Sequence, residues 1–250
     1  KDQINSELKQ AMLNKDVFVR DTLRLVTSEI KRFEVDNRKD PVDEDIVAIL
    51  KSQNIKKAHF IGHDRGARVA YRLAIDNPEL VSSTMFMDIV PTNTVFTELS
   101  ASLAFSYYHW FFLSQPFPVP EKLIERDPDQ FYNSCLQGWG ATGINAFSKN
   151  QLNAYQKSWR NNSCIRAMCD DYRAALNVDY FHDKEDKFKN KIKCPLLVLW
   201  GKKAKIEEWY DPIKIWQDWA ENVTGNSIDC GHYLPEEKPD ETCNHLLNFF

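Results

Sequence analysis

The chain lacks any run of the roughly 18 apolar residues that a membrane-spanning helix needs, and its first residues are charged rather than apolar. We therefore expect neither a membrane protein nor a secreted precursor, and we predict a cytoplasmic location. An excess of basic residues is also missing, because 32 lysines and arginines stand against 36 aspartates and glutamates, for a net charge of -4. Without such an excess, neither nucleic acid nor an anionic membrane is an expected partner.

Sequence signals for metals and cofactors are absent as well. The six cysteines contain no CxxC pair, so we expect reduced core thiols rather than a zinc site. The six histidines are scattered, and the sequence has neither a phosphate-binding loop nor a dinucleotide fingerprint. We therefore predict a protein that works with no metal and no cofactor.

Strands and helices alternate along the chain after residue 57. Short apolar runs predict strands at residues 58–62, 84–90, 194–200 and 226–229. Helical patterns follow them, the first over residues 66–76 and the last over residues 241–250. This order predicts the α/β fold class with a parallel sheet.

Two long segments depart from that alternation. Residues 92–190 are rich in aromatic side chains and have helical patterns, which predicts a helical lid over the carboxyl edge of the sheet. Residues 1–45 are helical in pattern and contain no strand signal. The predicted domains are a helical segment at 1–45 and a core at 46–250, which consists of 46–91 and 191–250 with the lid inserted between them.

Glycine is scarce, with eight in 250 residues, yet two glycines bracket Asp64 in the stretch GHDRG. This stretch fits G-x-D-x-G, the pattern of a nucleophile elbow with aspartate in place of serine. Such a strand-to-helix turn exposes its central residue at the start of a helix, whose dipole favours a carboxylate. The alternative is that Asp64 only caps the helix.

An elbow nucleophile works with an acid and a histidine that come later in the chain. His232 follows the last predicted strand, where such a histidine belongs, although a histidine after glycine can also be structural. Asp88 ends the second predicted strand and is the predicted acid. Glu207 and Asp211, after the third predicted strand, are the competing choices.

An aspartate nucleophile suits attack at an sp3 carbon that carries a halide or an epoxide oxygen, because attack at an acyl carbon would give an unstable anhydride. The product is an ester with Asp64, which water activated by His232 then cleaves. Arg65 and Arg68 are placed to bind a substrate carboxylate with their guanidinium forks. The alternative is that both arginines pair with acidic residues.

These residues resemble the fluoroacetate (haloacetate) dehalogenases of the α/β-hydrolase superfamily. The resemblance covers residues 46–250 and is carried by HFIGHDRGARVAYRLA, MDIVPT, YYHWFFLSQPFPVPE, MCDDYRAA, CPLLVLWG and GHYLPEEKPDE. It implies a small-molecule haloacid substrate, with Asp64 as nucleophile, His232 as base and Asp88 as orienting acid.

The resemblance also implies roles for side chains of the lid. His109, Trp110 and Tyr172 match the residues that hold the leaving halide, and their N–H and O–H groups are the donors that fluoride needs. Trp139 matches a further aromatic residue of the pocket. An epoxide hydrolase would typically offer two lid tyrosines instead, and it is the alternative function.

Residues 1–50 resemble a different family, the YqeY-like proteins, which are related to the tail domain of the tRNA-dependent amidotransferase B subunit. The resemblance is carried by INSELKQAMLNKDVFVRDTLRLVTSEIKRFEVD and DEDIVAILKSQ. It implies a fusion in which the hydrolase sheet lacks its first strands. One edge of the strand at 58–62 would then be unpaired and open to formation of a homodimer. A third possibility is therefore a truncated hydrolase without activity.

Overall fold

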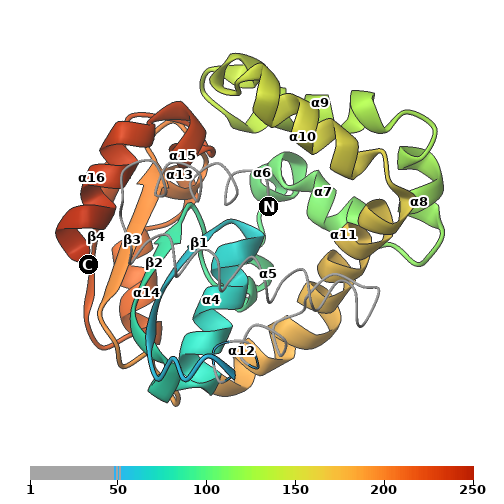
Figure 1. Ribbon diagram of the computed structural model, residues 1–250. Coiled ribbons are helices and arrows are strands. Elements are labelled where there is room, and N and C mark those ends of the chain that lie inside the picture. The colour runs from blue at the N-terminus through green and yellow to red at the C-terminus, as the bar shows by residue number, and fades with distance from the viewer. Residues whose placement is uncertain (1–47, 49, 51) are drawn as a thin grey trace. The chain divides into compact units, whose positions relative to one another are not determined.

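A four-stranded parallel sheet in the order β1-β2-β3-β4 forms the core of the unit Lys57–Phe250 in this computed structural model (Figure 1). Its strands are β1 (Ala58–His63), β2 (Val81–Met87), β3 (Leu196–Gly201) and β4 (Val223–Ile228). The structure describes residues 48, 50 and 52–250, so the helical segment predicted at 1–45 lies outside the described residues. The predicted α/β fold with a parallel sheet is confirmed.

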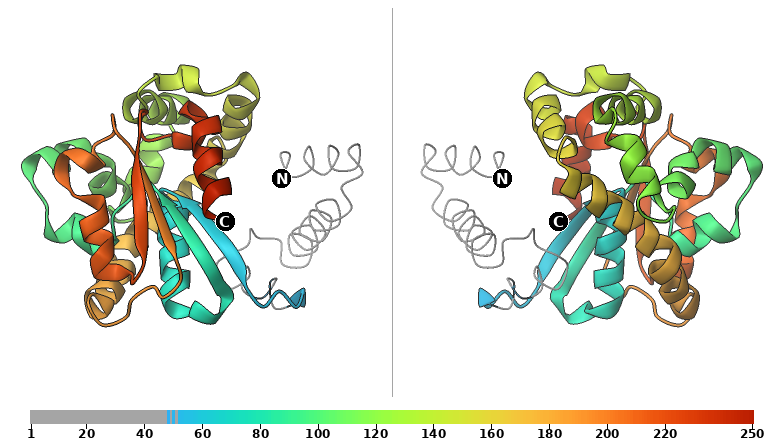
Figure 2. Two further views of the ribbon diagram at one scale, coloured as in Figure 1. Left: turned by 90° about the vertical axis from the view of Figure 1, so that its left-hand side faces the viewer. Right: turned by 90° about the vertical axis from the view of Figure 1, so that its right-hand side faces the viewer.

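Helices cover both faces of the sheet, because the two central strands are apolar on both faces. Successive side chains of a strand point to opposite faces. Met85 and Leu197 therefore pack toward α16 (Pro239–Phe249), whereas Phe86 and Val198 face the other layer. That layer contains α4 (Arg65–Asp76) and α14 (Pro212–Trp219), and Figure 2 shows α14 and α16 on opposite sides of the sheet.

Two strands begin earlier than their apolar runs predict. The second begins at Val81 rather than at residue 84, because the polar Ser83 joins the ladder opposite His59. It ends at Met87, since Asp88 has a φ of 53° and leaves the extended conformation. The fourth begins at Val223 rather than at residue 226, and it includes Gly225, where a side chain would collide with the backbone of β3.

The first strand, β1, is an edge strand within the described part of the chain. It pairs with β2 alone among residues 52–250, as the sequence predicts. Ile61 lies opposite Met85 in the ladder and on the same face, but its side chain is 46% exposed, whereas Met85 is fully buried. An apolar edge of this kind favours pairing with another chain, and the homodimer stays a prediction.

Helices fill the stretch between β2 and β3, where the sequence predicts a lid. They are α5 (Thr92–Thr97), α6 (Ala101–Ser106), α7 (Tyr108–Leu113), α8 (Val119–Ile124), α9 (Pro128–Trp139), η2 (Gly143–Ala146), α10 (Lys149–Trp159), α11 (Asn162–Ala174), the π-helical turn η3 (Ala175–Asp179) and α12 (Tyr180–Asp186). The last three follow one another directly and run from the lid toward α4 and α5 (Figure 1). Among the described residues, no helix combines the length and the apolar character that crossing a bilayer requires.

The chain returns to the sheet through short helices. After β3 come α13 (Ile206–Trp209) and α14, and after β4 come α15 (Leu234–Glu237) and α16. The loop between β4 and α15 carries His232, and the turn between β1 and α4 carries Asp64. Because the strands are parallel, both connections lie at the carboxyl edge of the sheet, under the lid.

We expect Gly62→Ala to reduce the free energy of unfolding severely, by about 3 kcal/mol or more, as overpacking against a rigid backbone does. A Cβ atom at Gly62 would lie 2.3 Å from Ala67 Cα and 2.5 Å from Ala67 N. Gly66→Ala is the matched control, since a Cβ there meets nothing within 4 Å. It should stabilise the protein by up to about 1 kcal/mol, because alanine is the better helix residue. Chemical denaturation of both variants measures the difference, and equal losses would contradict the prediction.

Candidate active site

Asp64 lies at the turn between β1 and α4, where the G-x-D-x-G pattern places it. Its backbone has φ 47° and ψ -120°, a conformation that non-glycine residues adopt only when surrounding contacts impose it. Those contacts are hydrogen bonds from Asp64 N to Met87 O at 3.2 Å and from Arg68 N to Asp64 O at 3.2 Å. The Asp64 side chain makes no capping hydrogen bond to α4. The capping alternative therefore fails, and the carboxylate has another role.

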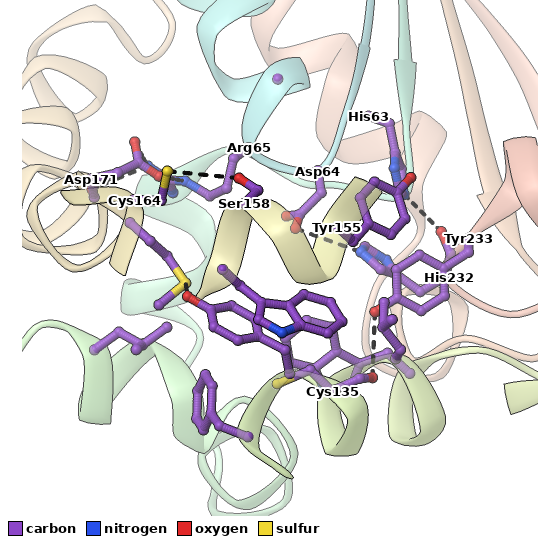
Figure 3. Close-up of a pocket in the computed structure, with 18 of the residues that line it drawn as sticks. His63, Asp64, Arg65, Cys135, Tyr155, Ser158, Cys164, Asp171, His232 and Tyr233 are labelled. Carbon is purple, nitrogen blue, oxygen red and sulfur yellow. Dashed lines mark hydrogen bonds and ion pairs between the residues drawn. The ribbon is translucent and has the colours of Figure 1, made fainter. Parts of the chain in front are cut away.

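The carboxylate of Asp64 faces His232, as Figure 3 shows. Asp64 Oδ2 lies 3.6 Å from His232 Nε2, and His232 Nδ1 lies 2.6 Å from Asp88 Oδ2. Asp88 is buried at the end of β2 and accepts a further hydrogen bond from Gly201 N at 2.9 Å. The three side chains thus form a continuous line in the order that a nucleophile, a base and an orienting acid require.

The two competing acids have other partners. Glu207 accepts a hydrogen bond from the indole of Trp200 at 2.8 Å. Asp211 caps α14 by accepting from Lys214 N at 3.1 Å. Asp88 is therefore the one of these three acids that contacts His232.

Strong electrostatic coupling joins His232 to both aspartates. Burial alone would lower the pKa of His232, but hydrogen bonds and charge interactions with Asp64 and Asp88 raise it to about 10. Burial would raise the pKa of Asp64, yet the hydrogen bond and positive charge of His232 hold it well below its usual range. At neutral pH the site therefore holds an Asp64 carboxylate beside a His232 imidazolium.

His63, the residue before Asp64, also contacts His232. Its Nε2 lies 2.8 Å from the carbonyl oxygen of His232, and the two rings are 4.7 Å apart. Burial and the charge of His232 lower the pKa of His63 to about 4, so the ring is neutral at pH 7. Because a carbonyl only accepts, the proton of this neutral ring belongs on Nε2. No role is predicted for His63 from the sequence, although its place inside the elbow pattern is an available signal.

Arg65 points away from Asp64 and toward Asp171 on α11 (Figure 3). Its Nη2 donates to Asp171 Oδ1 at 2.8 Å, and its Nε donates to Asp171 Oδ2. Asp179 lies 3.8 Å from the same guanidinium. For Arg65 the alternative of pairing with acidic residues is thus the observed one. The charge that it can offer to a substrate is largely compensated.

Arg68 has no such acidic partner among the described residues. It is 5% exposed, and its Nη1 donates to Val90 O at 2.9 Å and to Thr92 Oγ1 at 3.1 Å. Its guanidinium carbon lies 4.5 Å from the centre of the Trp110 ring. Its buried Nε has no hydrogen-bond partner within the described part of the chain. Of the two predicted carboxylate-binding arginines, Arg68 is therefore the one without a direct ion pair in the residues that the structure describes.

The four predicted lid residues come together beside this arginine. The ring of Tyr172 lies 5.8 Å from that of His109 and 5.7 Å from that of Trp110, and all three side chains are buried. The Trp139 ring lies 4.4 Å from His109 and 6.1 Å from His232. Burial lowers the pKa of His109 to about 4, so its ring is neutral at pH 7 and has one N–H to donate.

Two cavities open onto these residues. The first, of about 490 Å³, is lined mainly by aromatic and apolar side chains of the lid and is drawn in Figure 3. The second, of about 570 Å³, is lined by residues that include Arg68, His109 and Trp110. The residues that line both are Asp64, Cys135, Trp139 and His232. In residues 48, 50 and 52–250, no group of three or more His, Cys, Asp or Glu residues is placed to hold a metal ion.

Removing the acid that compensates Arg65 should strengthen binding of small carboxylates. Asp171→Asn keeps the shape of the side chain but removes its charge, and we expect the Kd for acetate to fall about threefold to tenfold, the effect of one partly exposed ion pair. The control is Asp170→Asn, which removes the neighbouring carboxylate that pairs with Arg166 and Arg173. Calorimetric titration with acetate measures both variants. Weaker binding by Asp171→Asn would contradict the prediction.

Comparisons with known proteins show similarity to the alpha/beta hydrolase fold family. A family model described as the alpha/beta hydrolase fold matches residues 14–239. A fluoroacetate dehalogenase from Burkholderia sp. is 38% identical over 201 residues, which cover 80% of this chain and 66% of that enzyme. A soluble epoxide hydrolase from Corynebacterium sp. strain C12 is 28% identical over 209 residues, which cover 82% of this chain and 71% of that enzyme.

A similar fold is found among solved structures. A crystal structure from Nostoc sp. PCC 7120, assigned to the alpha/beta hydrolases, aligns with a TM-score of 0.80 at 42% identity, covering 83% of this chain and 70% of that one. The chain thus spans about two thirds of the length of these relatives, and just under that share of the Burkholderia enzyme. The comparisons do not support the resemblance of residues 1–50 to YqeY-like proteins, because the hydrolase family model begins at residue 14.

Proposed function

The chain belongs to the alpha/beta hydrolase fold family, and within that family we propose that it is a hydrolytic dehalogenase of short haloacids such as fluoroacetate and chloroacetate. The observation that carries this proposal is the line from Asp64 through His232 to Asp88, with contacts of 3.6 and 2.6 Å. An aspartate at the first position favours attack at an alkyl carbon. The identity to the Burkholderia enzyme supports the same reaction.

The first step is displacement of the halide. The substrate carboxylate binds the guanidinium of Arg68, which directs the halogen-bearing carbon toward Asp64. An Asp64 carboxylate oxygen attacks that carbon, the carbon–halogen bond breaks, and the halide leaves with the bonding electron pair. The product is a carboxymethyl ester of Asp64. The N–H and O–H groups of His109, Trp110 and Tyr172 donate hydrogen bonds to the departing halide.

The second step is hydrolysis of the ester. Esterification neutralises Asp64, so His232 loses one of its two anionic neighbours and its pKa falls. The neutral imidazole then takes a proton from water, which attacks the ester carbonyl, while Asp88 holds His232 by the Nδ1 contact. The bond between the ester carbonyl carbon and the alkyl oxygen breaks, and the alkyl oxygen takes the second proton of the attacking water and leaves as glycolate. Asp64 is restored as a carboxylate and His232 as an imidazolium. The chemistry uses the chain's own side chains and water, with no cofactor.

A second candidate is an epoxide hydrolase, which shares the aspartate nucleophile. One observation favours it: the buried phenol of Tyr172 lines the same cavity as Asp64 and can donate its O–H to an epoxide oxygen. The Corynebacterium relative is a soluble epoxide hydrolase. Arg68, however, has no carboxylate within ion-pair distance in the described part of the chain, and a neutral epoxide gains nothing from its positive charge. This charge favours an anionic substrate.

Halide release by the purified chain tests the proposal. Fluoroacetate and chloroacetate are supplied separately, and released fluoride or chloride is measured with ion-selective electrodes, while styrene oxide tests the epoxide alternative. We expect catalytic halide release and no diol. Diol formation without halide release would favour the epoxide hydrolase. Release of neither product by protein that melts cooperatively would overturn both assignments and leave a truncated hydrolase without activity.

A further inference from the structure

The carboxylate of Glu237, at the end of α15, accepts hydrogen bonds from three backbone N–H groups. Glu237 Oε2 accepts from Ala141 N at 2.9 Å and from Gly231 N at 3.1 Å. Glu237 Oε1 accepts from Tyr233 N at 3.2 Å. Two of the donors are therefore the immediate neighbours of His232, and the third belongs to the lid.

The same carboxylate thus joins the loop of His232 to the loop that follows Trp139. A direct hydrogen bond from His232 N to Trp139 O, at 3.0 Å, runs between the same two loops. Their approach is so close that a Cβ atom on Gly231 would lie 2.2 Å from Ala141 N. The backbone on both sides of the His232 imidazole is therefore fixed by Glu237, a side chain that is separate from Asp64, His232 and Asp88.

We propose that Glu237 is a positioning residue that holds the imidazole of His232 for hydrolysis of the Asp64 ester. The proposal rests on the proposed function for the identity of the two steps. Attack by Asp64 on the substrate needs no proton transfer, whereas the ester is cleaved only when His232 lies within reach of a water molecule. A small displacement of the His232 backbone therefore slows the second step and leaves the first step intact.

Replacement of Glu237 by glutamine removes one of the two acceptor oxygens that the three N–H donors require. A carboxylate offers two acceptor oxygens, whereas an amide offers one oxygen and one NH2 group that repels backbone N–H donors. Glu237→Gln therefore leaves at least one of the three N–H groups without an acceptor. Glu237→Asp keeps both oxygens but withdraws them by one methylene, so it tests the same contacts with less disturbance of the fold.

The kinetic test separates the two steps. We expect Glu237→Gln to release the first equivalent of halide at the parent rate and to hydrolyse the ester about 10- to 100-fold more slowly, as misplacement of a reacting group by about 1 Å does. Intact-mass spectrometry after rapid quenching should show the carboxymethyl ester accumulating in Glu237→Gln, to a smaller extent in Glu237→Asp, and not in the exposed control Glu241→Gln. A variant that merely loses stability would slow both steps and accumulate no ester.

NMR titration of His232 tests the positioning role of Glu237 without any catalytic turnover. His232 has its pKa raised to about 10 by the two aspartates, so the titration of its ring in NMR spectra reports its distance from them. We expect this pKa to fall in Glu237→Gln and in Glu237→Asp, and to be unchanged in Glu241→Gln. If the parent releases no halide, the proposed function fails and the titration alone decides the role of Glu237. An unchanged His232 titration in both Glu237 variants would overturn the proposal.

Discussion

His232→Asn is expected to stop catalysis after one halide per chain. Asp64 can still attack the substrate, but no imidazole is left to activate water, so the carboxymethyl ester stays on Asp64. We expect steady-state turnover to fall by at least about a thousandfold. Such a loss is typical when one residue is removed from a nucleophile, base and acid that act together. Rapid-quench measurement of halide gives the size of the burst, and peptide mass spectrometry places the ester.

The matched control is His245→Asn, on α16, where the ring lies next to Asn226 rather than in the site. This variant should turn over at the parent rate. A His232→Asn variant that continued to release halide, or an ester found on a residue other than Asp64, would contradict the assigned mechanism.

Asp64→Asn is expected to abolish the first equivalent of halide as well. The amide nitrogen and oxygen are poor nucleophiles, so no ester forms and turnover falls by at least about a thousandfold. The same change removes one of the two anionic neighbours of His232, whose pKa should therefore fall by about one to three pH units. Halide assays and NMR titration of the His232 ring measure the two effects. Asp76→Asn, which removes an exposed carboxylate of α4 that pairs with Arg72, should change neither.

The interaction of His232 with Asp64 and Asp88 also makes the free energy of unfolding depend on pH. The pKa of His232 is about 10 in the folded protein against an ordinary value of 6.5, so the folded state binds the proton more tightly. The resulting stabilisation is complete below about pH 6.5 and is lost as the pH rises through about 10. Asp64→Asn should flatten this decline. Denaturation curves at pH 7 and pH 10 measure it, and parallel losses in parent and variant would contradict the explanation.

The alignment of Asp64, His232 and Asp88 could be predicted from the sequence because it depends on strand ends. Asp64 follows β1, Asp88 follows β2 and His232 follows β4, and parallel strands bring their carboxyl ends to one edge of the sheet. Local patterns thus sufficed for the nucleophile and the histidine. They favoured Asp88 but left Glu207 and Asp211 as competing choices, because the outcome depends on which side chain the sheet directs toward His232.

Features that depend on the packing of the lid were beyond prediction. The ion pair of Arg65 with Asp171 joins residues 106 positions apart, and it exists because the fold brings Asp171 of α11 next to the first residue of α4. The contacts of Glu237 likewise depend on the loop after α9 lying against the loop of His232. Strand bounds were predicted less well where polar residues such as Ser83 take part in the ladder, since apolar runs do not detect them.

The direct succession of α11, η3 and α12 has a consequence for motion. Its lid end carries Tyr172, and its other end carries Asp183, which is fully buried and accepts hydrogen bonds from Tyr71 Oη at 2.9 Å and Asn93 N at 3.0 Å. The phenol of Tyr172 is thus attached through one continuous helical element to the rigid interior. α10, by comparison, reaches α15 through the exposed hydrogen bond from Tyr155 Oη to Glu236 Oε1. Amide hydrogens along the element should exchange with solvent at the slow rates of the sheet, and those of α10 faster. Local opening of α10 can then widen the cavity that Tyr155 and Tyr172 both line while the Tyr172 phenol stays in place.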